Sequence, residues 1–365
     1  MKKILACCLA AAILLSLPGC GSGNALPPGQ GPAETPQAQA ELPRPDTATV
    51  PEPAAPAETE EPVIYDGVLF FTVSEIAFSL RGESEDIYAG TLPREAVTWE
   101  SGDESVAVFR DGVLTATGVG STTVSASYLE QRLECPVSCL ASTPEELASL
   151  DDTVLRSPKR YPPIVDAPEG YFADAALVGD SISYILFQNE AMQGYLNHPL
   201  FLVRGGTGIY GVLAHTMDIS YQGKETALDD ALFRSGVNKA FIMLGQNDLG
   251  WRNVEDTLES IRLLVDTIRN KCPELEIYIE SVIPEWTETT RNDKIYQYDE
   301  LLRAYTEEAG CHYLDILTYV EDHTGRMATV YSLDEGIHLN ADGCLAWAQA
   351  LNAYACLETL EESGQ

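Results

Sequence analysis

The chain has 365 residues, of which 45% are hydrophobic, and its formal net charge is −34. This length is enough for two modest domains with additional segments. The strong negative charge repels phosphate backbones and anionic lipid headgroups, so the composition argues against nucleic acid as a partner and against membrane attachment through charge.

The N-terminus predicts another kind of membrane attachment. Two lysines precede an apolar stretch at residues 4–17, which suits the core of a signal peptide and is too short to span a bilayer. The sequence LPGC that follows resembles the lipobox of bacterial lipoproteins. The resemblance implies that residues 1–19 are removed and that Cys20 carries lipid on the outer face of the membrane. An ordinary secretory signal is the alternative.

A proline-rich segment comes next. Residues 24–62 hold ten of the 21 prolines and seven acidic residues, with one arginine. No apolar face repeats along this segment, so it has no core to form. We expect residues 20–62 to be a disordered tether, which polyproline geometry and charge repulsion extend to a length on the order of 100 Å.

Residues 63–141 show the composition of short β-strands. The dipeptide Asp111-Gly112 predicts a tight turn between two of them. In one strand Val124 and Ala126 face one side and Ser125 the other, which indicates one dry and one solvated face. The predicted strands lie at 96–101, 105–109, 113–117, 122–128 and 133–139.

This part of the chain resembles the bacterial group-two immunoglobulin-like domain. The resemblance rests on Trp99, on the Asp-Gly turn and on the motif GVGSTTV at residues 118–124. It implies an all-β sandwich that serves as a spacer, with sugar binding as the alternative. We expect no catalytic group here.

We expect residues 142–164 to form a connector with a short helix after Thr143, and residues 165–362 to form a second domain. In that domain, apolar runs alternate with helical patterns, which indicates a parallel sheet with helices on both faces. The apolar runs lie at 175–179, 200–204, 239–244, 275–282 and 312–316, and the longest helical patterns at 254–270, 294–309 and 341–360.

Four motifs occur in order along the second domain, three of them directly after predicted strands: GDS at 179–181, RGGTG at 204–208, LGQND at 244–248 and DEGIHLNADG at 334–343. The carboxyl ends of parallel strands are where such sheets place their chemistry. Together the motifs resemble the SGNH, or GDSL, hydrolase family over residues 170–360. The resemblance implies a flavodoxin-like parallel sheet flanked by helices and a serine ester hydrolase.

Acyl transfer needs a nucleophile, a base and donors for the oxyanion. Ser181 is the candidate nucleophile, at the start of a predicted helix whose dipole favours negative charge. His338 is the proposed base, and it must be neutral to act, so activity should fall when acid protonates it. The resemblance implies three oxyanion donors: the backbone N–H groups of Ser181 and Gly208 and the side chain of Asn247. Gly205 replaces Gly208 if the register is shifted, and turn capping is the alternative for Asn247.

The third catalytic member departs from the family pattern, which has Asp three residues before the histidine. Here that position is Glu335, and Asp334 lies four before His338. Glutamate can hold the imidazole in the same way. We expect Glu335 to complete the triad, with Asp334 or a Ser-His dyad as alternatives. Asp180 and Asp248, which belong to the motifs, are expected to anchor loops.

The remaining candidates are cysteines and tryptophans. Cys272 and Cys311 each precede a predicted strand, so a disulfide can form if those strands are neighbours, but we expect reduced, buried cysteines. Trp251 and Trp286 follow strand ends, where they either stack on substrate or pack. No ligand cluster has metal spacing, so we expect no metal or cofactor.

These features predict a surface-tethered serine esterase that hydrolyses acetyl or short-acyl esters through an acyl-enzyme on Ser181. Acylated carbohydrate is the preferred substrate, because an extracellular acidic enzyme without a long apolar lid suits lipid less well. A lipid or lysophospholipid ester and acyl transfer to a sugar are the enzymatic alternatives. An adhesive lipoprotein whose hydrolase domain has lost activity is the alternative from another class.

Overall fold

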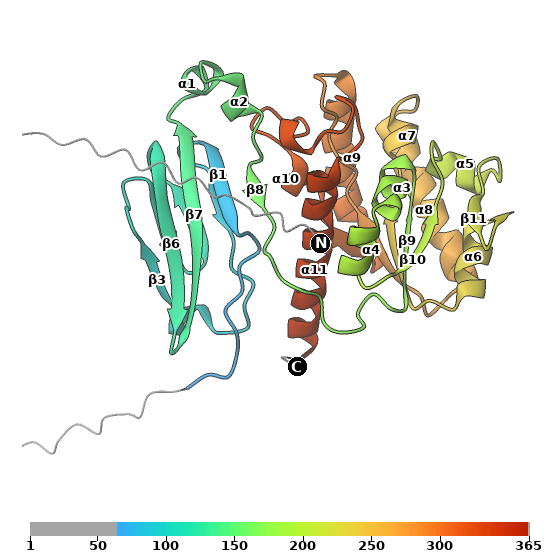
Figure 1. Ribbon diagram of the computed structural model, residues 1–365, viewed down its shortest axis with the longest axis horizontal. Coiled ribbons are helices and arrows are strands. Elements are labelled where there is room, and N and C mark those ends of the chain that lie inside the picture. The colour runs from blue at the N-terminus through green and yellow to red at the C-terminus, as the bar shows by residue number, and fades with distance from the viewer. Residues whose placement is uncertain (1–63, 364–365) are drawn as a thin grey trace, which may run out of the picture. The chain divides into compact units, whose positions relative to one another are not determined.

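The computed structural model of the protein describes residues 64–363 (Figure 1). The predicted signal peptide, Cys20 and the predicted tether lie outside these residues. We refer to residues 64–141 as the β region, to residues 142–164 as the connector and to residues 165–363 as the α/β region. No helix in the described part of the chain is both long and apolar enough to cross a membrane.

The β region contains two sheets around one apolar cluster. One sheet has the order β3-β6-β7-β1-β8 and the other β2-β5-β4. Strands β1 and β7 pair in parallel, whereas the other pairings are antiparallel. The strands are β1 (Glu75–Leu80), β2 (Ser84–Asp86), β3 (Thr98–Ser101), β4 (Ala107–Arg110), β5 (Val113–Ala116), β6 (Gly120–Tyr128) and β7 (Gln131–Ala141), with β8 (Arg160–Tyr161) from the connector. A short 3₁₀ helix, η1 (Arg94–Ala96), precedes β3.

Each of the five predicted strand segments forms a strand, β3 to β7. The turn between β4 and β5 is also as predicted, because Asp111 and Gly112 have φ angles of 50° and 80°, the positive values of a type I′ turn. The expectation of a solvated face fails at Ser125, which is buried together with Val124 and Ala126. The immunoglobulin-like assignment itself stays a prediction.

The connector begins with the predicted helix. In α1 (Pro144–Ala148), the Thr143 hydroxyl caps the N-terminus by accepting a hydrogen bond from the Glu146 N–H at 3.2 Å. A second short helix, α2 (Asp152–Leu155), follows and ends at Arg156. The connector then adds β8 to the edge of the first sheet, beside β1.

The α/β region is built on a five-stranded sheet in the order β10-β9-β13-β14-β15. Every pairing in it is parallel. The first strand in sequence therefore lies between the second and the third, which is the flavodoxin-like order. The strands are β9 (Ala175–Gly179), β10 (Leu200–Val203), β13 (Lys239–Met243), β14 (Glu276–Glu280) and β15 (His312–Leu314). A separate hairpin pairs β11 (Ile219–Tyr221) with β12 (Lys224–Thr226).

Helices cover both faces of this sheet, as predicted (Figure 1). Alternate residues of β9 pack into different clusters, Ala176 and Val178 against α8 and α9, and Ala175 and Leu177 against α3 and α11. The helices are α3 (Ser181–Gln188), α4 (Glu190–Tyr195), α5 (Ile209–Leu213), α6 (Leu228–Ser235), α7 (Gln246–Leu249), α8 (Val254–Lys271), α9 (Thr290–Ala309), α10 (Leu317–Val320) and α11 (Ala341–Ser363). The 3₁₀ helix η2 (Thr329–Tyr331) precedes the last of them.

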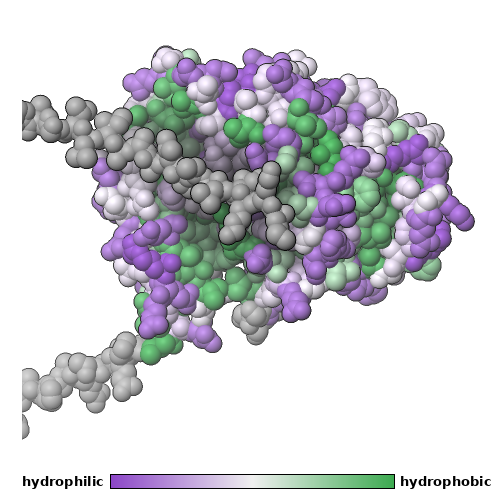
Figure 2. Space-filling model, viewed as in Figure 1, coloured by the Kyte–Doolittle hydropathy of each residue, from purple (hydrophilic) through white to green (hydrophobic). Residues whose placement is uncertain are grey.

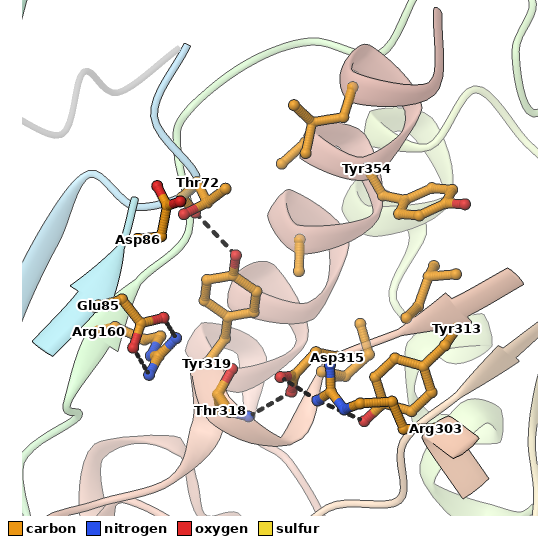
Figure 3. A pocket seen from close by; sticks show the side chains of 15 residues that line it. Thr72, Glu85, Asp86, Arg160, Arg303, Tyr313, Asp315, Thr318, Tyr319 and Tyr354 are labelled. Carbon is orange, nitrogen blue, oxygen red and sulfur yellow. Dashed lines mark hydrogen bonds and ion pairs between the residues drawn. The ribbon is translucent and has the colours of Figure 1, made fainter. Parts of the chain in front are cut away.

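The described residues belong to one compact unit, and polar side chains join the β region to the α/β region. The Tyr319 hydroxyl donates to the Thr72 carbonyl at 2.8 Å, and Arg160 forms an ion pair with Glu85 at 2.6 Å. These residues line a cavity of ≈ 280 Å³ (Figure 3). The β region is therefore held both by the connector, through Arg160, and by the α/β region, through Tyr319.

The six described cysteines are all free. Cys135 and Cys139 are buried in the cluster of the β region. Strands β14 and β15 are neighbours, yet Cys272 and Cys311 form no disulfide. Each sulfur has a different neighbour: the Cys311 sulfur accepts a hydrogen bond from Arg269 at 3.3 Å, while the Cys272 thiol is directed at the Asp229 carbonyl on α6.

Candidate active site

Ser181 is the first residue of α3, directly after β9 has ended. Asp180 caps this helix, because its Oδ1 accepts a hydrogen bond from the Ile182 N–H at 2.9 Å. The Ser181 side chain is half-buried at the carboxyl edge of the sheet. The strand and the capped helix together fix the position of the hydroxyl.

His338 lies beside Ser181 although 157 residues separate them in sequence. The Nε2 atom of His338 is 3.1 Å from the Ser181 Oγ, and its Nδ1 atom is 2.6 Å from the Asp334 Oδ2. An imidazole between a hydroxyl and a carboxylate is the arrangement in which the histidine can accept the serine proton while the acid fixes its orientation.

The structure corrects the expectation for Glu335. The carboxylate that contacts His338 belongs to Asp334, the alternative that the sequence left open. Glu335 has a φ of 53°, and this left-handed residue turns the chain so that the Asp334 Oδ1 accepts the Gly336 N–H at 2.9 Å. The turn directs the other oxygen of Asp334 at the imidazole. Burial works to raise the pKa of Asp334, but hydrogen bonds from His338 outweigh it and leave the pKa below its usual value.

The loop after β10 carries the predicted backbone donor. Asp248 anchors this loop by accepting the N–H groups of Ile209 at 2.7 Å and Tyr210 at 3.1 Å, as expected from the sequence. A Cβ at Gly208 would lie 2.4 Å from the Asp248 Oδ2, so this position requires glycine. The N–H of Gly208 has no hydrogen-bond acceptor among residues 64–363. Gly205, the alternative, also belongs to this loop, and a Cβ there would lie 4.0 Å from the Ser181 Cβ.

Asn247 connects the three loops. Its Nδ2 donates to the Asp180 Oδ2 and to the Thr207 carbonyl, each at 2.8 Å. Both N–H bonds of the amide are therefore engaged, whereas the sequence predicts that one is offered to an oxyanion. Asp180 is itself buried, and this burial raises its pKa to about 7.

The comparison with protein families supplies the deciding observation. Residues 177–345 match the family model of the GDSL-like lipase/acylhydrolase family, and this segment holds Ser181, Gly208, Asn247 and His338. The α/β region contains a GDSL-like lipase/acylhydrolase domain. No curated protein matches the chain.

Solved structures similar to this chain have low sequence identity to it. A GDSL-like lipase from Bacteroides thetaiotaomicron is 11% identical, with 55% of this chain and 93% of that chain covered and a TM-score of 0.39. A carbohydrate esterase family 3 protein from Talaromyces cellulolyticus is 14% identical, with coverages of 52% and 98% and a TM-score of 0.38. A carbohydrate acetylesterase family member from Sinorhizobium meliloti is 18% identical, with coverages of 49% and 95% and a TM-score of 0.34.

The two tryptophans near the GDSL-like site have different environments. Trp286 packs under the Arg156 guanidinium, whose carbon lies 4.8 Å from the ring centroid. Trp251 is 65% exposed, and its ring contacts Tyr210 edge to face at 5.7 Å. On the face shown in Figure 2, hydrophobic residues are separated by hydrophilic ones. Trp286 is therefore a packing residue, and Trp251 is free to contact a ligand.

Sequence reasoning missed two features of the GDSL-like site. Tyr210 was not singled out, although its place two residues after Gly208 was a usable signal. Arg156 lies before the predicted domain, where no motif points to it. Among residues 64–363, no group of three or more His, Cys, Asp or Glu side chains is placed to hold a metal ion.

Proposed function

We propose that this protein is a serine esterase that hydrolyses acetyl or other short-acyl esters, with acylated carbohydrate as its substrate. The observation that carries the proposal is the chain of contacts from Ser181 through His338 to Asp334, at 3.1 and 2.6 Å. These contacts lie within the residues that match the GDSL-like lipase/acylhydrolase family, whose members act on esters.

The proposed reaction proceeds in two halves. The Ser181 oxygen attacks the ester carbonyl carbon while its proton moves to the His338 Nε2. His338 then gives this proton to the departing alcohol, and the acyl group stays on Ser181. Water attacks the acyl-enzyme with His338 as base again, which releases the acid and restores the serine. Asp334 stabilises the protonated imidazole during both halves.

The carbonyl oxygen becomes negative during each attack and needs donors. We assign this role to the N–H groups of Ser181 and Gly208, which face no competing acceptor among residues 64–363. We assign the third donor to Asn247, which has to exchange its contact with the Thr207 carbonyl for the oxyanion. Loss of one such donor typically lowers the rate by about 10²–10³.

Exposed aromatic rings support a carbohydrate as the alcohol part of the ester. Tyr210 is 50% exposed, and with Trp251 it forms an aromatic pair on the segments that follow Gly208 and Asn247. The Arg252 guanidinium lies 5.1 and 5.4 Å from the centroids of these two rings. Flat rings with polar edges offer a sugar both an apolar surface and hydrogen bonds.

The cellular setting is a proposal from the sequence. We infer a lipoprotein anchored through Cys20 to the outer face of the bacterial membrane, with residues 20–62 as its tether. The β region would act as an immunoglobulin-like spacer. Two sheets around one apolar cluster support this assignment.

Hydrolysis of p-nitrophenyl acetate and p-nitrophenyl octanoate by the full chain tests the proposed reaction, with Ser181→Ala as the control. We expect the acetate to be preferred and the variant to lose about 10³-fold or more in kcat. Preference for octanoate would overturn the short-acyl proposal in favour of lipid esters. Turnover that survives in the variant, or no turnover at all, would contradict the proposed catalytic serine.

The carbohydrate proposal has a separate test. Replacing the exposed ring in Trp251→Ala should raise KM for an acetylated polysaccharide several-fold and leave the hydrolysis of p-nitrophenyl acetate unchanged. Phe233→Ala is the matched control, because Phe233 is 62% exposed on α6, away from the motif loops. Equal effects of the two variants would argue against a sugar subsite at Trp251.

A further inference from the structure

Arg156, at the end of α2 in the connector, is a buried cation with contacts in the GDSL-like domain. Its side chain is only 4% exposed and forms an ion pair with the fully buried Asp322. Its Nη2 also donates to the carbonyls of Trp286 at 2.9 Å and Met327 at 3.0 Å. One planar guanidinium therefore holds two segments of the domain, at Trp286 and at residues 322–327, although Arg156 precedes the residues that match the family.

Two further hydrogen bonds lead from Trp286 to the catalytic loop. The Trp286 N–H donates to the Gly336 carbonyl at 2.8 Å, and the Gly336 N–H donates to the Asp334 Oδ1 at 2.9 Å. Asp334 then contacts His338. The path from Arg156 to the imidazole is thus continuous: guanidinium, Trp286 peptide, Gly336 peptide, Asp334 carboxylate.

The tip of the catalytic turn is exposed, whereas the turn is followed by the fully buried Leu339. The Asp334 side chain is 43% exposed, and the neighbouring Leu333 is 59% exposed. Hydrogen bonds within the turn close it, such as the one from the Leu333 N–H to the His338 carbonyl at 2.8 Å, and the hydrogen bond from the Trp286 N–H ties its exposed tip to another part of the domain. A displacement of about 1 Å in a catalytic group can lower the rate by about 10².

We propose that Arg156 is a positioning residue for the turn that carries Asp334 and His338. This inference rests on the proposed esterase function. It makes the connector part of the working enzyme rather than a passive linker. Loss of the guanidinium leaves the nucleophile and the substrate surface in place and loosens the acid–base pair, so the chemical step slows while substrate binding is unchanged.

The test uses the full chain with Arg156→Lys and Arg156→Met. Lysine keeps the charge opposite Asp322, which preserves the fold, but its single ammonium replaces two nitrogens, the Nε that contacts Asp322 and the Nη2 that donates to both carbonyls. We expect kcat for p-nitrophenyl acetate to fall about 10-fold in Arg156→Lys and further in Arg156→Met, with KM within twofold of the wild type. Hydrogen exchange at residues 332–338 should become faster in both variants.

Lys159→Met is the matched control. Lys159 belongs to the same connector and pairs with Glu321 at 3.1 Å, but it has no contact with Trp286 among the described residues. We expect its kcat and the exchange at residues 332–338 to match the wild type.

Unchanged kcat in a folded Arg156→Lys protein would overturn the proposal. So would an equal loss of kcat in Lys159→Met, which would mean that the contacts between the connector and the domain are loosened in general. Faster exchange confined to the connector and to residues 322–327 would contradict it as well. A wild-type protein without esterase activity would instead refute the proposed function. The exchange measurement would then still decide whether Arg156 holds the turn.

Discussion

The β region and the GDSL-like domain both have apolar cores, but they differ in the charged groups that they bury. In the described part of the β region the buried polar residues are Ser79 and Ser125, and none is a carboxylate. The GDSL-like domain buries six carboxylates: Asp180, Asp248, Glu280, Glu285, Glu321 and Asp322.

The difference shows where the protein buries carboxylates, whose burial costs free energy. Burying a carboxylate is unfavourable unless hydrogen bonds or a cation compensate for the lost water. Asp180 and Asp248 obtain these partners from backbone N–H groups at the N-termini of α3 and α5, beside Ser181. Asp322 obtains them from Arg156. These three buried acids therefore fix segments that lead to the site, whereas the described part of the β region buries no carboxylate.

The largest effect is expected at the acid of the site itself. Replacing Asp334 by Asn keeps the size of the side chain but removes the charge that stabilises the protonated His338. We expect kcat for p-nitrophenyl acetate to fall by about 10³–10⁴. Glu335→Gln is the control, because the structure gives Glu335 no contact with the imidazole, and it should stay within twofold of the wild type. A larger loss in Glu335→Gln would restore the assignment that the sequence favoured.

A smaller loss is expected at the buried anchor Asp248. Asparagine keeps one acceptor but sets an NH₂ group against one of the two backbone N–H donors, those of Ile209 and Tyr210. We expect Asp248→Asn to lower kcat by about 10–10² and to destabilise the protein by about 1–3 kcal/mol. Urea unfolding and steady-state kinetics measure both. An unchanged kcat would show that the Gly208 loop keeps its shape without this carboxylate.

The fold was predictable because local sequence patterns indicate most of its strands and helices. The apolar runs at 175–179 and 239–244 form β9 and β13, and the pattern at 254–270 forms α8 almost to the residue. Period-two alternation likewise predicted β6. The short connector strand β8 carries no such pattern in its two residues, Arg160 and Tyr161, and only the tertiary structure places it beside β1.

The site was predictable where a motif fixes the backbone and not where side-chain geometry decides. Ser181 and His338 were placed by their motifs, and the structure brings them within 3.1 Å. The choice between Glu335 and Asp334 depended on a positive φ at Glu335, which spacing does not reveal. Arg156 is joined to the site through contacts more than a hundred residues away in sequence, and no local pattern predicts those.

Glu280 offers a test of the comparison that does not require activity. It accepts a hydrogen bond from the Trp347 Nε1 at 2.6 Å, and burial raises its pKa from 4.5 to about 8. Between these values the folded protein holds a proton that the unfolded chain has released, so the contribution of Glu280 to stability is fully present below pH 4.5 and is lost as the pH rises toward 8. Glu280→Gln should remove this pH-dependent part of the stability. In a melting experiment, each kcal/mol of stability corresponds to roughly 2–4 °C in melting temperature. If the melting temperatures of the wild type and of Glu280→Gln changed in the same way from pH 5 to 8, the raised pKa of Glu280 would be contradicted.

The smallest effect is expected in the β region, at an exposed carboxylate with comparable contacts. Asp86 pairs with Arg94 at 2.9 Å and accepts the Tyr88 N–H at 3.2 Å, but half of its side chain is exposed. Water and salt screen such a pair, so Asp86→Asn should cost about 0.2–1 kcal/mol, less at high salt, and leave kcat unchanged. The contrast with Asp248→Asn then isolates burial as the cause of the larger loss. Asp86 lines the cavity of ≈ 280 Å³ between the β region and the α/β region, on the side of the β region (Figure 3). A change in kcat beyond twofold would therefore mean that the β region influences the active site by a route other than Arg156.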